Sequence, residues 1–167
     1  PDDASGIAKH MEAAGAAAIS VLTEPEFFKG SIKNLESVRR AVNIPVLRKD
    51  FIIEKSQIYE TESDLILLIA GILGEGLSDF VDEAIEGGRE PLVEVHNEME
   101  LENTLSTRAT IIGINNPFVF GNFFIFQRFT IHIKYFYSFY IFGKVSQFIP
   151  PGSPGRQLQF CFIGINS

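Results

Sequence analysis

Short apolar runs recur along the first two-thirds of the chain, and the stretches between them have an apolar residue at every third or fourth position. Continuous apolar runs of this kind are typical of strands that are buried on both faces, as in a parallel sheet. The pattern predicts strands at residues 16–22, 45–51, 64–69, 91–95 and 110–114.

The intervening stretches have the periodicity of amphipathic helices. The clearest has Ile32, Leu35, Val38 and Val42 on one stripe, directly after Ser31, which is a residue type that caps helices. Further helices are predicted at residues 7–14, around 57–59, at 77–85 and at 97–105. Strand and helix therefore alternate.

Strict alternation of strand and helix predicts an α/β fold with a parallel sheet, either open and doubly wound or closed as a barrel. In both architectures the functional groups gather at the carboxyl ends of the strands. The candidates at the predicted strand ends are Thr23, Glu24, Lys49, Phe51, Glu94, His96 and Asn115.

Lys49 is the first candidate for chemistry. In a strand alternate side chains share a face, so Lys49 lies on the same side as Leu47 and Phe51. An apolar setting disfavours a charged ammonium group and so lets a lysine exchange a proton near neutral pH. The alternative is a strand-end lysine in solvent, because strands often end in charged residues.

Glu94 and Asn115 follow the same rule of alternation. Glu94 shares a face with Leu92, and Asn115 shares a face with Ile111 and Gly113. If these strands are neighbours, an amine, a carboxylate and an amide converge at one end of the sheet. A carboxylate in mid-strand is costly to bury without a partner, which favours a functional role for Glu94.

Composition narrows the classes of ligand. The net charge of −7 argues against nucleic acid or an anionic membrane as partner and favours a small organic substrate. The single cysteine, Cys161, excludes an intrachain disulfide, and nothing suggests an oxidising compartment, so a cytoplasmic location is expected. His10, His96 and His132 lie in unrelated contexts, so no metal site is expected.

The composition changes near residue 116. Residues 1–116 hold all 21 acidic residues, whereas residues 117–167 hold none of them and 12 of the 16 phenylalanines. We therefore expect one domain at 1–116, followed by a tail at 117–167 that is a frameshifted or unspliced reading. A membrane-surface segment is the alternative for the tail, and its residues 149–156 are interpreted as an irregular linker.

Residues 6–116 resemble the indole-3-glycerol phosphate synthase family, whose members are (β/α)8 barrels of tryptophan biosynthesis. The segments that carry the resemblance are AAAISVLTEPEFFKGS at 16–31, IPVLRKDFIIEKSQIYE at 44–60, LILLIAGIL at 65–73, EPLVEVHNEMELE at 90–102 and TIIGINN at 110–116. It implies a partial TIM barrel that contains strands 2–6 of the family.

The same resemblance implies an activity and roles for individual residues. The family closes the ring of carboxyphenylamino-deoxyribulose phosphate with loss of CO2 and water, and it needs no metal or organic cofactor. Lys49 matches a lysine that acts as general acid, Glu94 a glutamate that exchanges protons with the ring-closed intermediate, and Asn115 an asparagine that holds polar groups of the substrate. The apolar wall around the substrate ring would consist of Phe28, Leu47, Phe51, Leu67 and Ile69.

The implied partners are the anionic phosphate substrate and, by fusion or association, other tryptophan-pathway enzymes. Neither nucleic acid nor a membrane is expected as a partner.

The sequence also departs from the family pattern. The family's first strand, with a second catalytic lysine and a glutamate, would precede residue 1, so we expect the chain to start inside a longer protein. The stretch between Gln57 and Leu65 is about three residues short, and Pro117-Phe118 stands where the family has arginine and aspartate. Two alternatives therefore stay open, namely an inactive barrel fragment and an open-sheet module that binds a phosphate ligand without turnover.

Overall fold

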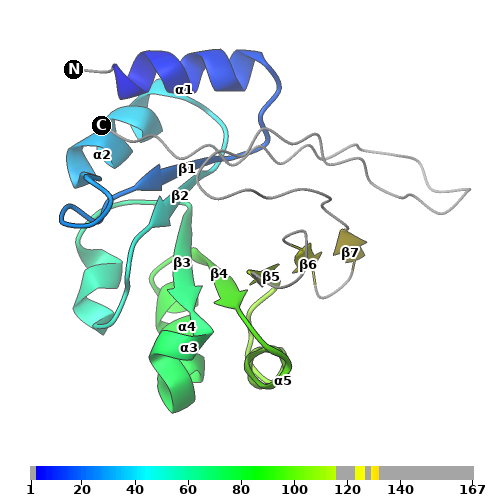
Figure 1. Cartoon of the computed structure of the whole chain (residues 1–167). Coiled ribbons are helices and arrows are strands. Elements are labelled where there is room, and N and C mark those ends of the chain that lie inside the picture. Colours follow the sequence, from blue (N-terminus) through cyan, green and yellow to red (C-terminus); the bar gives the residue numbers. More distant parts are fainter. Residues whose placement is uncertain (1–2, 116–122, 127–128, 132–167) are drawn as a thin grey trace, which may run out of the picture.

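The computed structural model describes residues 3–115, 123–126 and 129–131 (Figure 1). Its helices are α1 Ala4–Ala13, α2 Ile32–Ala41, α3 Ala70–Leu73, α4 Leu77–Glu86 and α5 Glu98–Leu105, with 3-10 helices η1 Lys55–Tyr59 and η2 Gly74–Gly76. Its strands are β1 Ile19–Leu22, β2 Val46–Lys49, β3 Leu65–Ile69, β4 Glu90–Val95, β5 Ile111–Ile114, β6 Phe123–Phe126 and β7 Phe129–Ile131.

The strands form one sheet in the order β1-β2-β3-β4-β5-β6-β7, which is their order in the chain. The first five are parallel to one another. A doubly wound sheet reverses its strand order at a switch point, and this sheet has no reversal. Of the two architectures that the sequence left open, the structure therefore has the one consistent with a partial (β/α)8 barrel.

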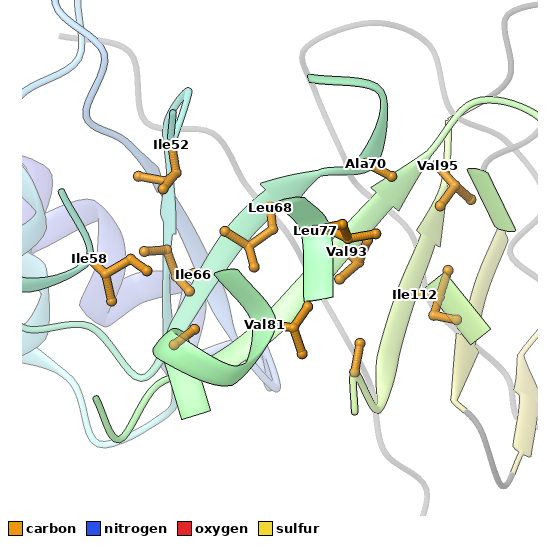
Figure 2. Close-up of a cluster of buried hydrophobic side chains, with 12 residues drawn as sticks. Ile52, Ile58, Ile66, Leu68, Ala70, Leu77, Val81, Val93, Val95 and Ile112 are labelled. Carbon is orange, nitrogen blue, oxygen red and sulfur yellow. The ribbon is translucent and has the colours of Figure 1, made fainter. Parts of the chain in front are cut away.

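The helices pack on one side of the parallel strands, over two apolar clusters. One cluster joins α1 and α2 to β1 and β2 through Leu35, Val38 and their neighbours. The other joins α4 to β3, β4 and β5, and Figure 2 shows Leu68 and Val93 of the strands together with Val81 of the helix. Burying side chains of this size stabilises the fold by about 1.5–3 kcal/mol each.

The opposite face of the same strands carries a cluster formed by strand residues alone. We call it the inner-face cluster, and its buried members are Leu47, Leu65, Leu67, Leu92 and Ile111, with Ile69 partly buried beside them. The intervening residues of β3, Ile66 and Leu68, belong to the helix-facing cluster. Alternate residues of one strand thus divide between the helix side and the side that would be the barrel interior.

Local signals fix where α2 and α5 begin. The Ser31 hydroxyl oxygen accepts a hydrogen bond of 3.1 Å from the Asn34 backbone N–H, and the Asn97 side-chain oxygen accepts one of 3.0 Å from the Glu100 N–H. The predicted cap at Ser31 is confirmed, and each of the two caps leaves its helix starting close to the carboxyl end of the preceding strand.

Several predicted elements differ in extent from the observed ones, and the predicted strand at 45–51 is confirmed only for residues 46–49. The predicted strand at 16–22 is confirmed only for residues 19–22, because Gly15 (φ 89°) and Ala16 close α1 through hydrogen bonds to the carbonyls of Glu12 and Met11. The predicted helix around residues 57–59 is the single 3-10 turn η1. The short connection between β2 and β3 leaves no room for a longer helix.

The strands β6 and β7 were not predicted. They continue the sheet antiparallel, with β6 paired to β5 and β7 paired to β6. β6 is apolar throughout, without alternation, and β7 is only three residues long, so periodicity alone could not identify them although their residue types have high β-propensity. A barrel would continue with a parallel strand at this edge.

The division of the chain at residue 116 stays a prediction. Apart from β6 and β7, the segment 117–167 lies outside the described residues, and so do the interpretations of it as a frameshift, a linker or a membrane-surface segment. In the part of the chain that is described, no helix is both long enough and apolar enough to cross a bilayer.

Candidate active site

The candidate site lies at the carboxyl end of the parallel strands, where the inner-face cluster ends. This cluster contains three of the residues predicted for the apolar wall, Leu47, Leu67 and Ile69. Leu47 and Leu67 are each 3% exposed. The whole cluster comes from four neighbouring strands, β2, β3, β4 and β5, which supply a continuous apolar floor below the polar strand ends.

Lys49 is the last residue of β2 and lies beside Leu22 of β1 in the sheet register. It is partly buried, and by alternation it projects to the same side as Leu47. Its carbonyl accepts a hydrogen bond of 3.0 Å from the Thr23 N–H. Within the described residues its ammonium group forms no ion pair with Glu94 or with any other carboxylate.

Arg48, the neighbour of Lys49, is buried on the other side of β2 and was missed by the sequence analysis. It is 1% exposed, and its guanidinium donates to the Thr23 hydroxyl, the Gln57 carbonyl, Asp50 and Glu60. The Thr23 hydroxyl in turn donates a 2.6 Å hydrogen bond to Asp50. This network ties the ends of β1 and β2 to η1 directly behind Lys49.

Two aromatic residues of the predicted wall meet above the strand ends. The rings of Phe28 and Phe51 have centroids 5.9 Å apart and are tilted by 42°, a geometry that aromatic pairs favour. Phe51 follows β2, and Phe28 lies in the loop after β1. The structure thus brings these two residues together.

The loop that carries Phe28 is held by a carboxylate. Glu24 accepts hydrogen bonds from the backbone N–H groups of Glu26, Phe27 and Phe28 at 2.7–3.0 Å. Burial acts to raise the pKa of Glu24, but the three donors outweigh it, so this pKa lies below its usual range. Gly30 lies at the end of the loop. A side chain does not fit at this position, because a Cβ there would lie 2.5 Å from the backbone of Leu22.

Glu94 and Asn115 meet at the ends of β4 and β5. The side-chain amide of Asn115 donates a hydrogen bond of 3.1 Å to Glu94 Oε1. Glu94 pairs with Gly113 in the register, so no side chain on β5 stands beside it and Asn115 reaches it from two residues further along. The side chain of Glu94 is 17% exposed. The structure brings this carboxylate together with the amide of Asn115.

His96 also lies against Glu94, a contact that the sequence analysis did not assign. Its Nε2 is 3.3 Å from Glu94 Oε1, and its Nδ1 is 3.2 Å from Glu100 Oε2. The backbone N–H of His96 donates to the same Glu100 oxygen at 2.8 Å. Alternation alone places Glu94 and His96 on one face of the strand, but Glu100 comes from α5 and needs the fold to bring it there.

Among the described residues no cluster of histidine, cysteine, aspartate and glutamate has the arrangement of a metal site. The polar groups at the strand ends include the ammonium of Lys49, the carboxylates of Glu24 and Glu94, the imidazole of His96 and the side-chain amide of Asn115. Such a set can donate and accept protons and can hold polar groups of a small organic molecule beside an apolar floor.

Comparison with known proteins agrees with this arrangement. The sequence profile of the family described as indole-3-glycerol phosphate synthase matches residues 2–118. The chain belongs to the indole-3-glycerol phosphate synthase family. The predicted resemblance is therefore confirmed.

Curated relatives named indole-3-glycerol phosphate synthase are similar to the same part of the chain. That from Endomicrobium trichonymphae is 52% identical over 114 residues, covering 66% of this chain and 44% of the relative. That from Halobacterium salinarum is 46% identical, covering 68% and 45%, and that from Bacillus mycoides is 50% identical, covering 65% and 44%. The chain thus spans less than half the length of these relatives.

A solved structure supports the fold. The N-acetylmannosamine-6-phosphate 2-epimerase from Clostridium perfringens superposes with a TM-score of 0.50 over 65% of this chain and 51% of its own, at 16% sequence identity. A likeness at this identity concerns the fold alone, and it covers about half of the other chain.

Proposed function

We propose that this chain carries part of the active site of an indole-3-glycerol phosphate synthase, a carboxy-lyase of tryptophan biosynthesis. The observation that carries the proposal is the contact between Glu94 and Asn115 at the strand ends, above the inner-face cluster. Membership of the family supports it.

The proposed reaction joins two parts of one substrate, carboxyphenylamino-deoxyribulose phosphate. A ring carbon that bears the carboxylate attacks the carbonyl carbon of the sugar-derived chain, and the carbonyl oxygen takes a proton. Loss of CO2 leaves its bonding electrons in the ring, and the new hydroxyl then leaves as water. The benzene ring recovers its aromaticity when CO2 leaves, and removal of a proton from the carbon next to the nitrogen, as the hydroxyl departs, completes the five-membered ring of the indole.

Each residue has a role in this scheme. Lys49 donates the proton to the carbonyl oxygen or to the departing hydroxyl. Glu94 exchanges protons with the ring-closed intermediate, and Asn115 holds Glu94 and polar groups of the substrate. General acid–base catalysis by a placed group contributes about 10²–10⁴-fold to a rate.

The substrate ring lies against the apolar wall of Phe28, Leu47, Phe51, Leu67 and Ile69. The inner-face cluster and the tilted pair of Phe28 and Phe51 support this proposal. Apolar and aromatic side chains would orient the planar ring and exclude water from the reacting carbon.

Turnover by the purified chain tests the proposal. The expected result is formation of indole-3-glycerol phosphate from the synthetic substrate, followed by indole fluorescence, and a loss of about 10²-fold or more in Lys49→Ala. Lys33→Ala is the matched control, because Lys33 is an exposed lysine on α2. Equal rates in Lys49→Ala and the unchanged chain would remove Lys49 from the mechanism.

Calorimetric titration with the same substrate separates the alternatives. A folded chain that binds the substrate without turnover is an open-sheet binding module, and one that neither binds nor turns over is an inactive fragment. Either result contradicts the proposed activity of this chain.

Partners and location are part of the same proposal. The ligand is a small anion that bears a phosphate, with no metal or organic cofactor. We also infer a cytoplasmic location and fusion to, or association with, other enzymes of tryptophan biosynthesis. Cell fractionation with co-purification of tagged protein tests both.

A further inference from the structure

Two phenylalanines stand next to each other in the loop after β1, but their surroundings differ. Phe28 is partly buried, and its ring lies against that of Phe51 with the centroids 5.9 Å apart. Phe27 is 78% exposed. Because the two side chains are chemically the same, their residue type does not decide which of them faces the candidate site. The backbone conformation of the loop decides it.

The backbone of this loop is held at its start by the carboxylate of Glu24. Oε1 accepts a hydrogen bond of 2.8 Å from the Glu26 N–H, and Oε2 accepts bonds of 2.7 and 3.0 Å from the N–H groups of Phe27 and Phe28. Glu24 is only 9% exposed. Three successive N–H groups on one carboxylate fix the direction of the chain at both phenylalanines.

The end of the loop is held beside the same strand. The N–H of Gly30 donates to the Glu24 carbonyl at 2.7 Å, and the N–H of Ser31 donates to the Leu22 carbonyl at 3.1 Å. Lys29, just before Gly30, has a φ of 55°, a conformation that residues other than glycine adopt uncommonly and that the surrounding contacts have to stabilise. The loop thus returns to its starting point, and the carboxylate at its start sets the conformation in between.

The second ring of the pair is fixed separately. Asp50 Oδ1 accepts a hydrogen bond of 2.9 Å from the Phe51 N–H, and its Oδ2 accepts bonds of 2.6 Å from the Thr23 hydroxyl and 2.9 Å from Arg48. Phe51 is therefore held by contacts that do not involve the Glu24 side chain. A change at Glu24 should move one ring of the pair and leave the other in place.

We propose that Glu24 selects Phe28, and not Phe27, as the ring that meets Phe51, and that it thereby acts as a positioning residue for the aromatic ring of the substrate. The identity of the ligand rests on the proposed function, whereas the selection of Phe28 does not. Glu24 acts through backbone N–H groups, so its role belongs to the binding of the substrate ring and not to proton transfer.

Replacement of Glu24 by glutamine tests the selection with little change of shape. Burial acts to raise the pKa of Glu24, but the three backbone donors outweigh it, so both oxygens are ionised acceptors at neutral pH. The amide keeps one acceptor oxygen and places an NH2 donor against the other N–H groups. Glu26→Gln is the matched control, because this exposed side chain lies in the same loop and its replacement removes the same formal charge.

Hydrogen exchange of the unchanged chain, measured by nuclear magnetic resonance without ligand, is the first measurement. The amides of Glu26, Phe27 and Phe28 should exchange about tenfold or more slowly than in a peptide of the same sequence, because hydrogen bonds to a charged group are strong. Exchange at the rate of the peptide would mean that the carboxylate does not hold the loop, and it would overturn the proposal.

Nuclear Overhauser effects between the rings of Phe28 and Phe51 measure the selection itself. They should be present in the unchanged chain and in Glu26→Gln, and absent from Glu24→Gln. Their persistence in Glu24→Gln overturns the proposal. Their loss from Glu26→Gln overturns it too, because the loop would then respond to net charge and not to the contact.

Binding and kinetics measure the positioning role. With carboxyphenylamino-deoxyribulose phosphate as the ligand, Glu24→Gln should raise the dissociation constant and KM by about two- to tenfold, which is the size of one aromatic contact. The value of kcat should change by less than about twofold, because the groups that exchange protons stay in place. A lower kcat with an unchanged KM would place Glu24 in the chemical step and would overturn the positioning role.

A double variant shows whether Glu24 acts through Phe28. Adding Glu24→Gln to Phe28→Ala should change the dissociation constant by less than about twofold, because the ring that Glu24 positions is already gone. Phe27→Ala should leave binding unchanged, since this ring lies in solvent. The role is overturned if Glu24→Gln weakens binding as much without the Phe28 ring as with it, or if Phe27→Ala weakens binding like Phe28→Ala.

The two proposals fail in different ways. A chain that binds no substrate loses the proposed function and with it the ligand of the wall, whereas the selection of Phe28 over Phe27 still depends on the exchange rates and the ring contact. A chain that binds and converts the substrate equally well with glutamine at position 24 retains the function and loses the positioning role.

Discussion

The burial of Arg48 could not be predicted from its residue type. Alternation correctly separates it from Leu47 and places it on the far side of β2, yet arginines on a strand end are usually exposed. Here the side chain is fully buried, because Asp50, Glu60 and the Gln57 carbonyl surround it. No local pattern could show this, since two of these partners lie in the turn η1 and just after it.

Replacing Arg48 by methionine should therefore destabilise the protein strongly. The carboxylate of Asp50, whose side chain is 11% exposed, would lose its cationic partner. Breaking a buried ion pair in this way costs about 3–5 kcal/mol. We expect a loss of that size in the free energy of unfolding of Arg48→Met, measured by urea titration.

Arg40→Met provides the control for this change. Arg40 is 76% exposed in a pair with Glu36 one helical turn away, and such pairs contribute about 0.3–0.5 kcal/mol. If Arg48→Met costs no more than this control, the network behind Lys49 does not hold the strand ends together.

At the level of secondary-structure elements, Asp64 joins α2, β2 and β4. Its carboxylate accepts hydrogen bonds from Arg39 of α2 at 2.7 and 3.3 Å, and from the backbone N–H of Val46 in β2 at 2.8 Å. Its own backbone N–H donates to the Val46 carbonyl, and its carbonyl accepts from Glu90 at the start of β4. One residue thus aligns the amino ends of β2, β3 and β4 opposite the candidate site.

These contacts predict an acid-sensitive contribution to stability. Burial acts to raise the pKa of Asp64, but Arg39 and the Val46 N–H outweigh it, so the pKa in the folded protein is lowered. The contribution is then complete above the unfolded value of about 4 and is lost as the pH falls through the lower, folded value. The difference in unfolding free energy between the unchanged chain and Asp64→Asn should therefore shrink from pH 6 to pH 3.

Urea titrations at several pH values measure this difference. Asp79→Asn, at an exposed aspartate of α4, is the matched variant for comparison. A difference for Asp64→Asn that stays constant over the whole range would show that its carboxylate gains nothing from the fold.

The sequence predicts the elements better than it predicts how they connect. Ser31 and Asn97 are local signals, and both caps are present in the structure. The end of α1 at Ala16 and the single turn η1 depend on how the chain leaves a helix or crosses a short gap. The contact of His96 with Glu100 likewise needs α5 to pack beside β4, which no periodicity specifies.

For the whole molecule, the order of the strands decides between the two architectures that the sequence allows. Alternation of strand and helix is compatible with a doubly wound sheet and with a barrel, and only the unreversed order of β1 to β5 distinguishes them. The pairing of Glu94 with Asn115 could be predicted once β4 and β5 are neighbours. The antiparallel strands β6 and β7 could not be predicted, because β6 is apolar throughout and β7 is too short for its pattern to mark a buried face.

The same order predicts that the parallel sheet unfolds as one unit. Leu35 packs between α2 and the first two strands, whereas Leu68 packs between β3 and α4, and both are 0% exposed. Leu35→Ala should lower the free energy of unfolding by about 2–5 kcal/mol. If the sheet is one cooperative unit, the amide of Leu68 should exchange at least about 25-fold faster in this variant, since 1.4 kcal/mol is a factor of about ten.

Hydrogen exchange followed by nuclear magnetic resonance measures both regions at once. Acceleration confined to α1, α2, β1 and β2 would instead divide the sheet into two units that open separately, each stabilised by its own helix-facing cluster. In that case Arg48, which ties β1 and β2 to η1, would mark the boundary between them, and Arg48→Met should then uncouple the exchange of Leu68 from that of Val21 still further.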